Sequence, residues 1–256
     1  MDIPLESWYH AIEKRHSVRQ YSEEAVPVEL LDEIEHICDK FHPFHGARAA
    51  LVREPQSDAF KGLIGPLLKV KGAPHYVAFV GDADFNHFET ALGYMGEGVI
   101  LGATSKGLNS CWVTGFFRPE NVEEDVAIKD GERIIGVSPI GYAEESKDRV
   151  GTAREHDRKP LSKLIKSGNI DQKWVKPALE AARLAPSAVN RQPWRFEVSS
   201  DSIIISYAGL FDLGTSKAID CGIAMLHAEL GARHAGMAGE WTLLSKPKVA
   251  KFDAAT

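Results

Sequence analysis

The sequence predicts an α+β protein whose helices and strands fall into two similar halves. Each half contains a long helix with apolar residues at a 3.6-residue period, at residues 85–106 and 220–236. Each of these helices ends beside a glycine and leads to a strand that contains a tryptophan. The charged stretch 144–159 is the best candidate for a linker. We therefore expect a first half at residues 1–150 and a shorter second half at residues 151–256.

Local patterns predict the elements of the first half. Apolar residues recur at helical spacing from Leu5 to Ile12, and Pro27 is typical of a first helical turn. Four glycines interrupt the long helix, and each costs about 0.5–1 kcal/mol relative to alanine, which indicates close packing against another helix or a flat ligand. The expected helices span residues 5–12, 27–41, 60–71 and 85–106, with a short one from Pro119, and the expected strands span 75–80 and 133–142.

The second half is predicted to repeat this pattern. A helix is expected at 174–184, and two strands at 195–199 and 203–207 are joined by a short turn, as in an ordinary hairpin. The long helix follows, and residues 240–244 form the last expected strand.

The composition is that of an ordinary globular protein with no general affinity for polyanions. Of its 256 residues, 30 are lysine or arginine and 36 are aspartate or glutamate, which gives a formal net charge of −6. This charge argues against nucleic-acid or anionic-membrane binding, but it permits one local phosphate site.

No segment resembles a membrane span or a secretion signal. No apolar run reaches the length of a bilayer, and the acidic first six residues differ from a signal peptide. Cys38, Cys111 and Cys221 are isolated, so we expect neither a disulfide framework nor a cysteine-rich metal site, and a cytoplasmic location.

The stretch from Ala185 to Phe196 is the most informative part of the chain. Pro186 ends the preceding helix, and the short polar side chains of Ser187 and Asn190 follow in an irregular turn where they are able to face a ligand. A plain helix-to-strand connection with a core tryptophan is the alternative. The ordered set resembles the flavin-binding signature of the FMN-dependent nitroreductase superfamily. This resemblance implies that the following residues lie against FMN: Pro186, Ser187, Ala188, Asn190 and Gln192.

A second motif follows the first helix. Arg15 and Arg19 flank Ser17, and two arginine forks with a hydroxyl between them suit one phosphate group, although a solvated basic patch is the alternative. The run resembles the Arg-x-Ser-x-Arg of nitroreductases, which binds the FMN phosphate and ribityl chain, and the resemblance includes His16 among the contacts.

Further family resemblances complete the expected site. Residues 107–115 resemble the family segment whose backbone faces flavin N5 and O4, which implies contacts from Thr114 and Gly115, whereas a plain strand-to-loop glycine is the alternative. A lysine near flavin N1 and O2 is expected at Lys71, with Lys69 as the alternative. A basic residue that completes the phosphate pocket is expected at Arg158, with Arg149 as the alternative.

The first half departs from the family pattern at one place. The family has its Pro-Ser-Asn loop soon after the second helix, but residues 42–46 contain no such loop. His36, His42 and His45 there are irregularly spaced, so we expect surface histidines and no metal site. The arginine motif and the loop each occur once. The chain therefore resembles a smaller branch, similar to the TM nitroreductases, in which a divergent second lobe is fused to the first.

The resemblance implies a nitroreductase-like fold with a central, mostly antiparallel sheet flanked by helices. One chain would imitate a dimer and build a single FMN site between its halves, with a monomer and a homodimer both open. The implied function is transfer of a hydride from NADH or NADPH through flavin N5 to a nitroaromatic, quinone or similar acceptor. No side chain is expected as a catalyst because FMN does the redox chemistry. Non-catalytic FMN carriage or sensing, and another flavin reaction such as reductive dehalogenation, are the alternatives.

Overall fold

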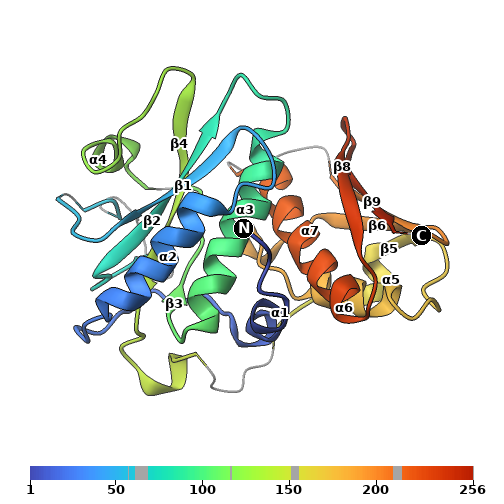
Figure 1. Cartoon of the computed structure of the whole chain (residues 1–256), viewed down its shortest axis with the longest axis horizontal. Helices are drawn as coiled ribbons and strands as arrows, with labels where there is room; N and C mark the ends of the chain where they lie inside the picture. The colour runs from blue at the N-terminus through green and yellow to red at the C-terminus, as the bar shows by residue number, and fades with distance from the viewer. Residues whose placement is uncertain (57, 61–68, 116, 151–155, 210–214, 256) are drawn as a thin grey trace.

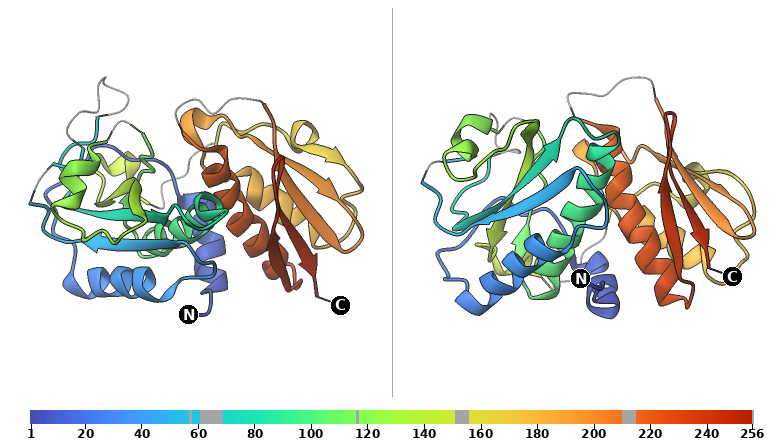
Figure 2. Two further views of the ribbon diagram at one scale, coloured as in Figure 1. Left: turned by 90° about the horizontal axis from the view of Figure 1, so that it is seen from above. Right: turned by 45° about the horizontal axis from the view of Figure 1, so that its top comes forward.

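The computed structural model describes residues 1–56, 58–60, 69–115, 117–150, 156–209 and 215–255. Its helices and strands form two groups that lie next to each other, each with its own sheet (Figure 1). The chain starts beside the long helices in the middle, and it ends at the sheet of the second group (Figure 2).

The first group has a four-stranded antiparallel sheet in the order β1-β2-β4-β3. Its apolar strands are buried, and β2 is buried at six consecutive residues from Tyr76 to Gly81. The elements are α1 (Leu5–Lys14), α2 (Val28–Lys40), β1 (Ala47–Val52), β2 (His75–Asp82), α3 (Phe88–Ser105), β3 (Asn109–Ser110), α4 (Pro119–Glu123) and β4 (Glu132–Gly141).

The second group has a five-stranded sheet in the order β5-β6-β7-β9-β8. All its neighbouring strands are antiparallel except β5 and β6. The elements are α5 (Leu161–Leu164), β5 (Ile165–Ser167), α6 (Val175–Arg183), β6 (Trp194–Val198), β7 (Ser202–Tyr207), α7 (Lys217–His234), β8 (Gly239–Leu243) and β9 (Lys248–Ala254).

Helices α3 and α7 pack against each other between the two sheets (Figures 1 and 2). Glycines allow this approach, because a Cβ atom on Gly93 would collide with the carbonyl oxygen of Ile219. The reverse contact has the same form, since a Cβ atom on Gly222 would collide with the carbonyl oxygen of Thr90. The prediction of close packing at the α3 glycines is therefore confirmed, and the partner at Gly93 is another helix.

The α+β class and the antiparallel pairing are confirmed. The strands are shared between two sheets, whereas one central sheet was expected. Strand 240–244 was predicted to be the last, which is wrong, because β9 follows it and pairs with both β7 and β8. Strands β1 and β5 were not predicted. The strand expected at Trp112 is wrong, because β3 ends at Ser110 and Trp112 lies after it, outside any strand. The helix expected at 60–71 falls mostly at residues 61–68, outside the described residues.

The exposure of the three histidines agrees with the prediction of surface positions. His36, His42 and His45 are exposed, and the three cysteines are buried as free thiols. None of the helices in the described part of the chain has the length and apolar character needed to cross a bilayer.

Candidate functional site

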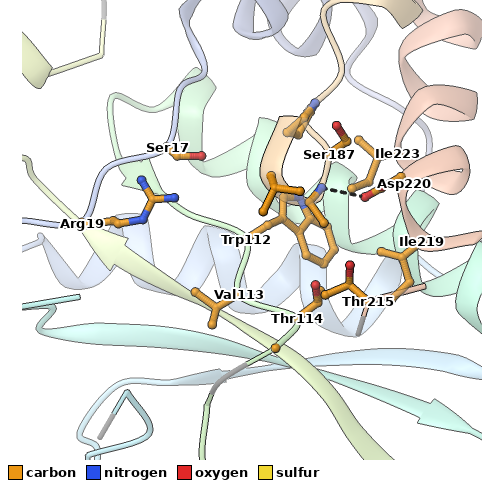
Figure 3. A pocket seen from close by; sticks show the side chains of 14 residues that line it. Ser17, Arg19, Trp112, Val113, Thr114, Ser187, Thr215, Ile219, Asp220 and Ile223 are labelled. Carbon is orange, nitrogen blue, oxygen red and sulfur yellow. Dashed lines mark hydrogen bonds between the residues drawn. The ribbon is translucent and has the colours of Figure 1, made fainter. Parts of the chain in front are cut away.

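A cleft of about 180 Å³ lies where the first half meets the start of α7. Figure 3 shows Ser17 and Arg19 on one side, Ser187 and Asp220 on the other, and Trp112 between them. The lining residues are Ser17, Arg19, Trp112, Val113, Thr114, Gly115, Pro186, Ser187, Ala188, Val189, Thr215, Ile219, Asp220 and Ile223. Seven of the predicted site residues are thus brought together in one cleft: Ser17, Arg19, Thr114, Gly115, Pro186, Ser187 and Ala188.

The loop after α6 has an unusual backbone. Val189, Asn190 and Gln192 have φ angles of 47°, 56° and 48°. Positive φ is rare outside glycine and is a true outlier for a β-branched residue, and Val189 is also 84% exposed. Backbone strain of this kind persists only where the surroundings hold it, and it gathers at functional sites. Within the loop, the backbone N–H of Gln192 donates to the Ser187 hydroxyl at 2.9 Å.

Asp220 in the first turn of α7 holds one side of this loop. Its carboxylate accepts from the backbone N–H of Ala188 at 3.1 Å, the bond drawn in Figure 3, and from Arg191 Nε at 2.6 Å. Arg191 Nη2 also donates to the carbonyl of Thr215 at 2.9 Å. Asp220 and Arg191 are nearly buried, so the ion pair joins the loop firmly to α7.

The segment 157–159 holds the other side of the loop. The backbone N–H of Lys159 donates to Gln192 Oε1 at 2.7 Å, and Arg158 Nη1 donates to Asn190 Oδ1 at 3.1 Å. Asn190 Nδ2 in turn donates to the carbonyl of Asp157 at 2.9 Å. Asn190 and Gln192 are therefore outside the cleft lining, and the flavin contacts predicted for them stay predictions.

Some residues of the arginine motif line the cleft, and others lie in the interior. Ser17 pairs with Ser110 in a β-bridge, and it reaches the cleft together with Arg19. Arg15 is only 3% exposed, and its Nε lies 3.9 Å from Glu97 Oε1, too far for a hydrogen bond. His16 Nε2 lies 2.7 Å from the carbonyl oxygen of Asp148.

Arg15 and Arg158 form a cationic pair beside the loop. Burial lowers the pKa of Arg15, because the distant Glu97 carboxylate does not offset the loss of water. Burial, together with the positive charge of Arg15, lowers the pKa of Arg158 to about 10. The Nε atoms of both residues are buried and have no hydrogen-bond partner in the described part of the chain. These donors suit an anion, since buried polar groups are normally bonded.

The alternatives left open by the sequence lie elsewhere. Arg149 is paired with Glu24 at 2.6 Å, which favours Arg158 as the basic residue beside the loop. Lys71 bonds through its backbone to Arg19 and Tyr21, and it lines a neighbouring cavity together with Lys69. The role predicted for Lys71 at flavin N1 and O2 stays a prediction.

Two sets of lining residues were not singled out as site residues from the sequence. Trp112 stacks on Phe79 with ring centroids 4.4 Å apart and donates from Nε1 to Glu97 at 2.7 Å. The apolar spacing of Ile219 and Ile223 indicated a helix face that packs on the core. This pattern does not distinguish a side chain buried in the core from one that lines a cleft. Groups of histidine, cysteine and carboxylate residues that could hold a metal ion are absent from the described residues.

The arrangement of sheets, helices and cleft is that of the nitroreductase fold. A structure named a "putative nitroreductase" from Thermotoga maritima aligns with a TM-score of 0.66 and 21% identity, covering 99% of this chain and 96% of that one. The chain belongs to the family described as "Putative TM nitroreductase", whose model matches residues 7–232.

Other solved structures align over a smaller part of the chain. An "FMN-dependent Nitroreductase" from Clostridium difficile has a TM-score of 0.48 and 20% identity, covering 60% of this chain and 95% of its own. A nitroreductase family protein from Streptococcus pneumoniae has a TM-score of 0.49 and 18% identity, covering 61% and 98%. No curated protein matches the sequence significantly.

Proposed function

We propose that the protein is an FMN-dependent oxidoreductase that passes a hydride from NADH or NADPH to a small acceptor such as a nitroaromatic or a quinone. The observation that carries the proposal is the pair of guanidinium groups on Arg15 and Arg158, whose Nε atoms are buried and have no partner in the described part of the chain. A phosphate monoester has close to two negative charges near neutral pH and several acceptor oxygens. It therefore fits both the charge and the free donors of this pair.

The donor set around the cleft suits the rest of the cofactor. In this proposal Arg15 and Arg158 hold the phosphate, and the hydroxyls of Ser17 and Ser187 bind the ribityl chain. Backbone groups of Thr114 and Gly115 approach the ring edge, where a residue without a Cβ atom allows close contact. The proposed site also includes the other residues that the sequence predicts as FMN contacts: His16, Arg19, Lys71, Pro186, Ala188, Asn190 and Gln192.

When bound, FMN would supply hydride chemistry at N5, so this chain needs no nucleophile of its own. The task of the protein is then to bind, orient and exclude water. Trp112, Ile219 and Ile223 give the cleft an apolar wall. Arg19 lies at the cleft and supplies positive charge that favours an electron-rich ring.

The site is proposed to be a composite of two lobes, residues 1–150 and 151–256, with one FMN per chain. Ser17, Arg19 and residues 112–115 come from the first lobe, and the loop and α7 come from the second. In this proposal the chain works in the cytoplasm as a monomer or homodimer on a small-molecule acceptor.

Titration of the purified protein with FMN tests the proposal. We expect about one FMN per chain, and at least tenfold weaker binding for Arg15→Gln and for Arg158→Gln, because hydrogen bonds to charged groups contribute about 1.5–3 kcal/mol. The matched control is Arg53→Gln, since Arg53 pairs with acidic residues of α2 outside the cleft. Unchanged affinity in both the Arg15 and the Arg158 variant would contradict the phosphate assignment.

A second measurement separates enzyme from carrier. We expect the FMN-loaded protein to oxidise NADH or NADPH when a quinone is added. Tight FMN binding with no oxidation of either nucleotide would instead support non-catalytic FMN carriage.

A further inference from the structure

Glu97 is a wholly buried carboxylate in the middle of α3 that the cleft lining does not include. Trp112 Nε1 donates to its Oε2 at 2.7 Å, and His227 Nε2 lies 2.9 Å from its Oε1. Arg15 Nε lies 3.9 Å from the same Oε1. Since a charged side chain is almost never fully buried without partners, this convergence of three segments requires an explanation.

The hydrogen-bond partners of His227 fix where its protons lie. His227 is also wholly buried, and its Nδ1 is 3.1 Å from the carbonyl oxygen of Ala181. A carbonyl only accepts, so Nδ1 carries a proton. Nε2 faces a carboxylate oxygen, so a second proton lies between Nε2 and Glu97. The Trp112 donor and the nearby charge of Arg15 favour the ionised carboxylate, which places that proton on His227.

Glu97 links Trp112 in the wall of the cleft to Arg15 in the interior behind it. Trp112 belongs to the wall, and Arg15 belongs to the cationic pair with Arg158. Gly96, which precedes Glu97 in α3, leaves space for the Trp112 ring, because a Cβ atom on Gly96 would collide with the indole. His227 comes from α7, so the second close partner of Glu97 is supplied by the other half.

We propose that Glu97 is a positioning residue, which fixes Trp112 in the cleft wall and holds Arg15 at the anion end while a protonated His227 from α7 balances its charge. The effect on FMN affinity rests on the proposed function, because it requires that the protein binds FMN. The state of the cluster itself does not depend on FMN and is measurable in the cofactor-free protein.

Two substitutions of similar size separate the bonds of Glu97 from its volume. In Glu97→Gln the amide oxygen accepts from Trp112 and the amide nitrogen donates to a neutral His227, so both bonds survive. In Glu97→Met neither bond survives. We expect Glu97→Gln to bind FMN within about threefold of wild type and Glu97→Met to bind at least tenfold more weakly, as expected for lost buried hydrogen bonds.

The matched control is Glu229→Met. Glu229 is a buried carboxylate that also links the long helices, because it accepts from the Tyr94 hydroxyl at 2.6 Å. Its hydrogen-bond partners include Tyr94 and Arg233, and neither Trp112 nor Arg15 is bonded to it. We expect Glu229→Met to lower the melting temperature while FMN affinity stays within about twofold of wild type. Equal loss of FMN affinity in Glu229→Met and Glu97→Met would reduce Glu97 to a structural role and overturn the proposal.

NMR of the cofactor-free protein tests the cluster directly, with Trp112→Phe used to assign the indole N–H. We expect ¹⁵N-labelled His227 to carry protons on both ring nitrogens in wild type and on Nδ1 alone in Glu97→Gln. The Trp112 N–H should resist exchange in both proteins. Identical histidine spectra would overturn the assignment of the proton. If Glu97→Met does not fold, FMN affinity in Trp112→Phe replaces it, and wild-type affinity there would also overturn the proposal.

Discussion

The two long helices each begin beside a cavity, but only one of these cavities gathers residues suited to a flavin. The start of α7 lines the cleft with Ser17, Arg19 and the loop 186–189. The start of α3 lines a cavity of about 430 Å³ with Tyr207 and the residues that follow β8. Among the described residues that line this second cavity, none belongs to the predicted flavin set.

The difference between the two cavities comes from the loops around the helices. The fourth residue of α7 is Asp220, which holds the loop through Ala188 and Arg191. The fourth residue of α3 is Ala91, which is buried and has no polar group to offer. The two helices contact each other through reciprocal glycine contacts, so both contribute in the same way to the packing between them. They differ in the polar side chains at their first turns.

Removal of the Asp220 clamp is expected to have the largest effect. Asp220→Asn leaves Arg191 buried without a counter-charge, and loss of one partner of a buried ion pair costs about 3–5 kcal/mol of unfolding free energy. Urea unfolding measures this loss, and FMN binding should weaken with it. At the start of α3, Glu89→Gln is the control, because Glu89 accepts a hydrogen bond from the neutral Ser216 hydroxyl and forms no buried ion pair among the described residues. A loss as small as that of the control would show that the clamp does not hold the loop.

The two sheets are expected to differ in their response to acid. Arg48 binds Glu132 through two hydrogen bonds of 2.8 and 2.7 Å, and these lower the pKa of Glu132 from 4.5 to about 2. Because the pKa of Glu132 is lower in the folded than in the unfolded state, the ion pair stabilises the protein at pH values above the unfolded-state pKa. This stability is lost as the pH falls from about 4.5 through 2. We expect Glu132→Gln to remove on the order of 1–2 kcal/mol at pH 7 after solvent screening, and little at pH 2.

The corresponding pair in the second sheet joins Lys166 to Glu197 by one bond of 2.7 Å, and Lys166 is largely exposed. Its hydrogen bond also lowers the pKa of Glu197. Because water screens this pair, Glu197→Gln should change the unfolding free energy less than Glu132→Gln at pH 7. Chemical unfolding at a series of pH values compares them, and a greater dependence in the second sheet would contradict the expectation.

Relief of backbone strain is expected to give the smallest effect. Val189 and His87 both have positive φ, at 47° in the loop and 68° before α3. Val189→Gly should stabilise the fold by about 0.5–1 kcal/mol, because glycine adopts this conformation without the steric penalty of a branched side chain. His87→Gly should gain less, since histidine tolerates this region better than valine. Thermal unfolding checks the order, and destabilisation by Val189→Gly would show that the loop is not strained.

Part of this protein is determined by short stretches of sequence. The 3.6-residue period of apolar residues predicted the helices, because a helix packs on the core with one apolar face whatever element lies opposite. Pro186 ended α6, and Ser17, Arg19, Ser187 and Gly115 were assigned to a common site from local motifs. Strands β1, β5 and β9 were missed. The sequence Ala-Arg-Ala-Ala-Leu-Val of β1 is rich in alanine, which is depleted in strands, and pairing with β2 decides its conformation.

The tertiary structure alone decided the remaining parts of the site. Asp220 bonds the loop through Ala188 and Arg191, and Glu97 bonds Trp112, because the fold brings these separate segments together. Helical spacing places a residue on a face, but it does not say which segment lies opposite. Trp112, Ile219 and Ile223 therefore have the pattern of core residues in the sequence, and only the crossing of the two helices turns them into the wall of a cleft.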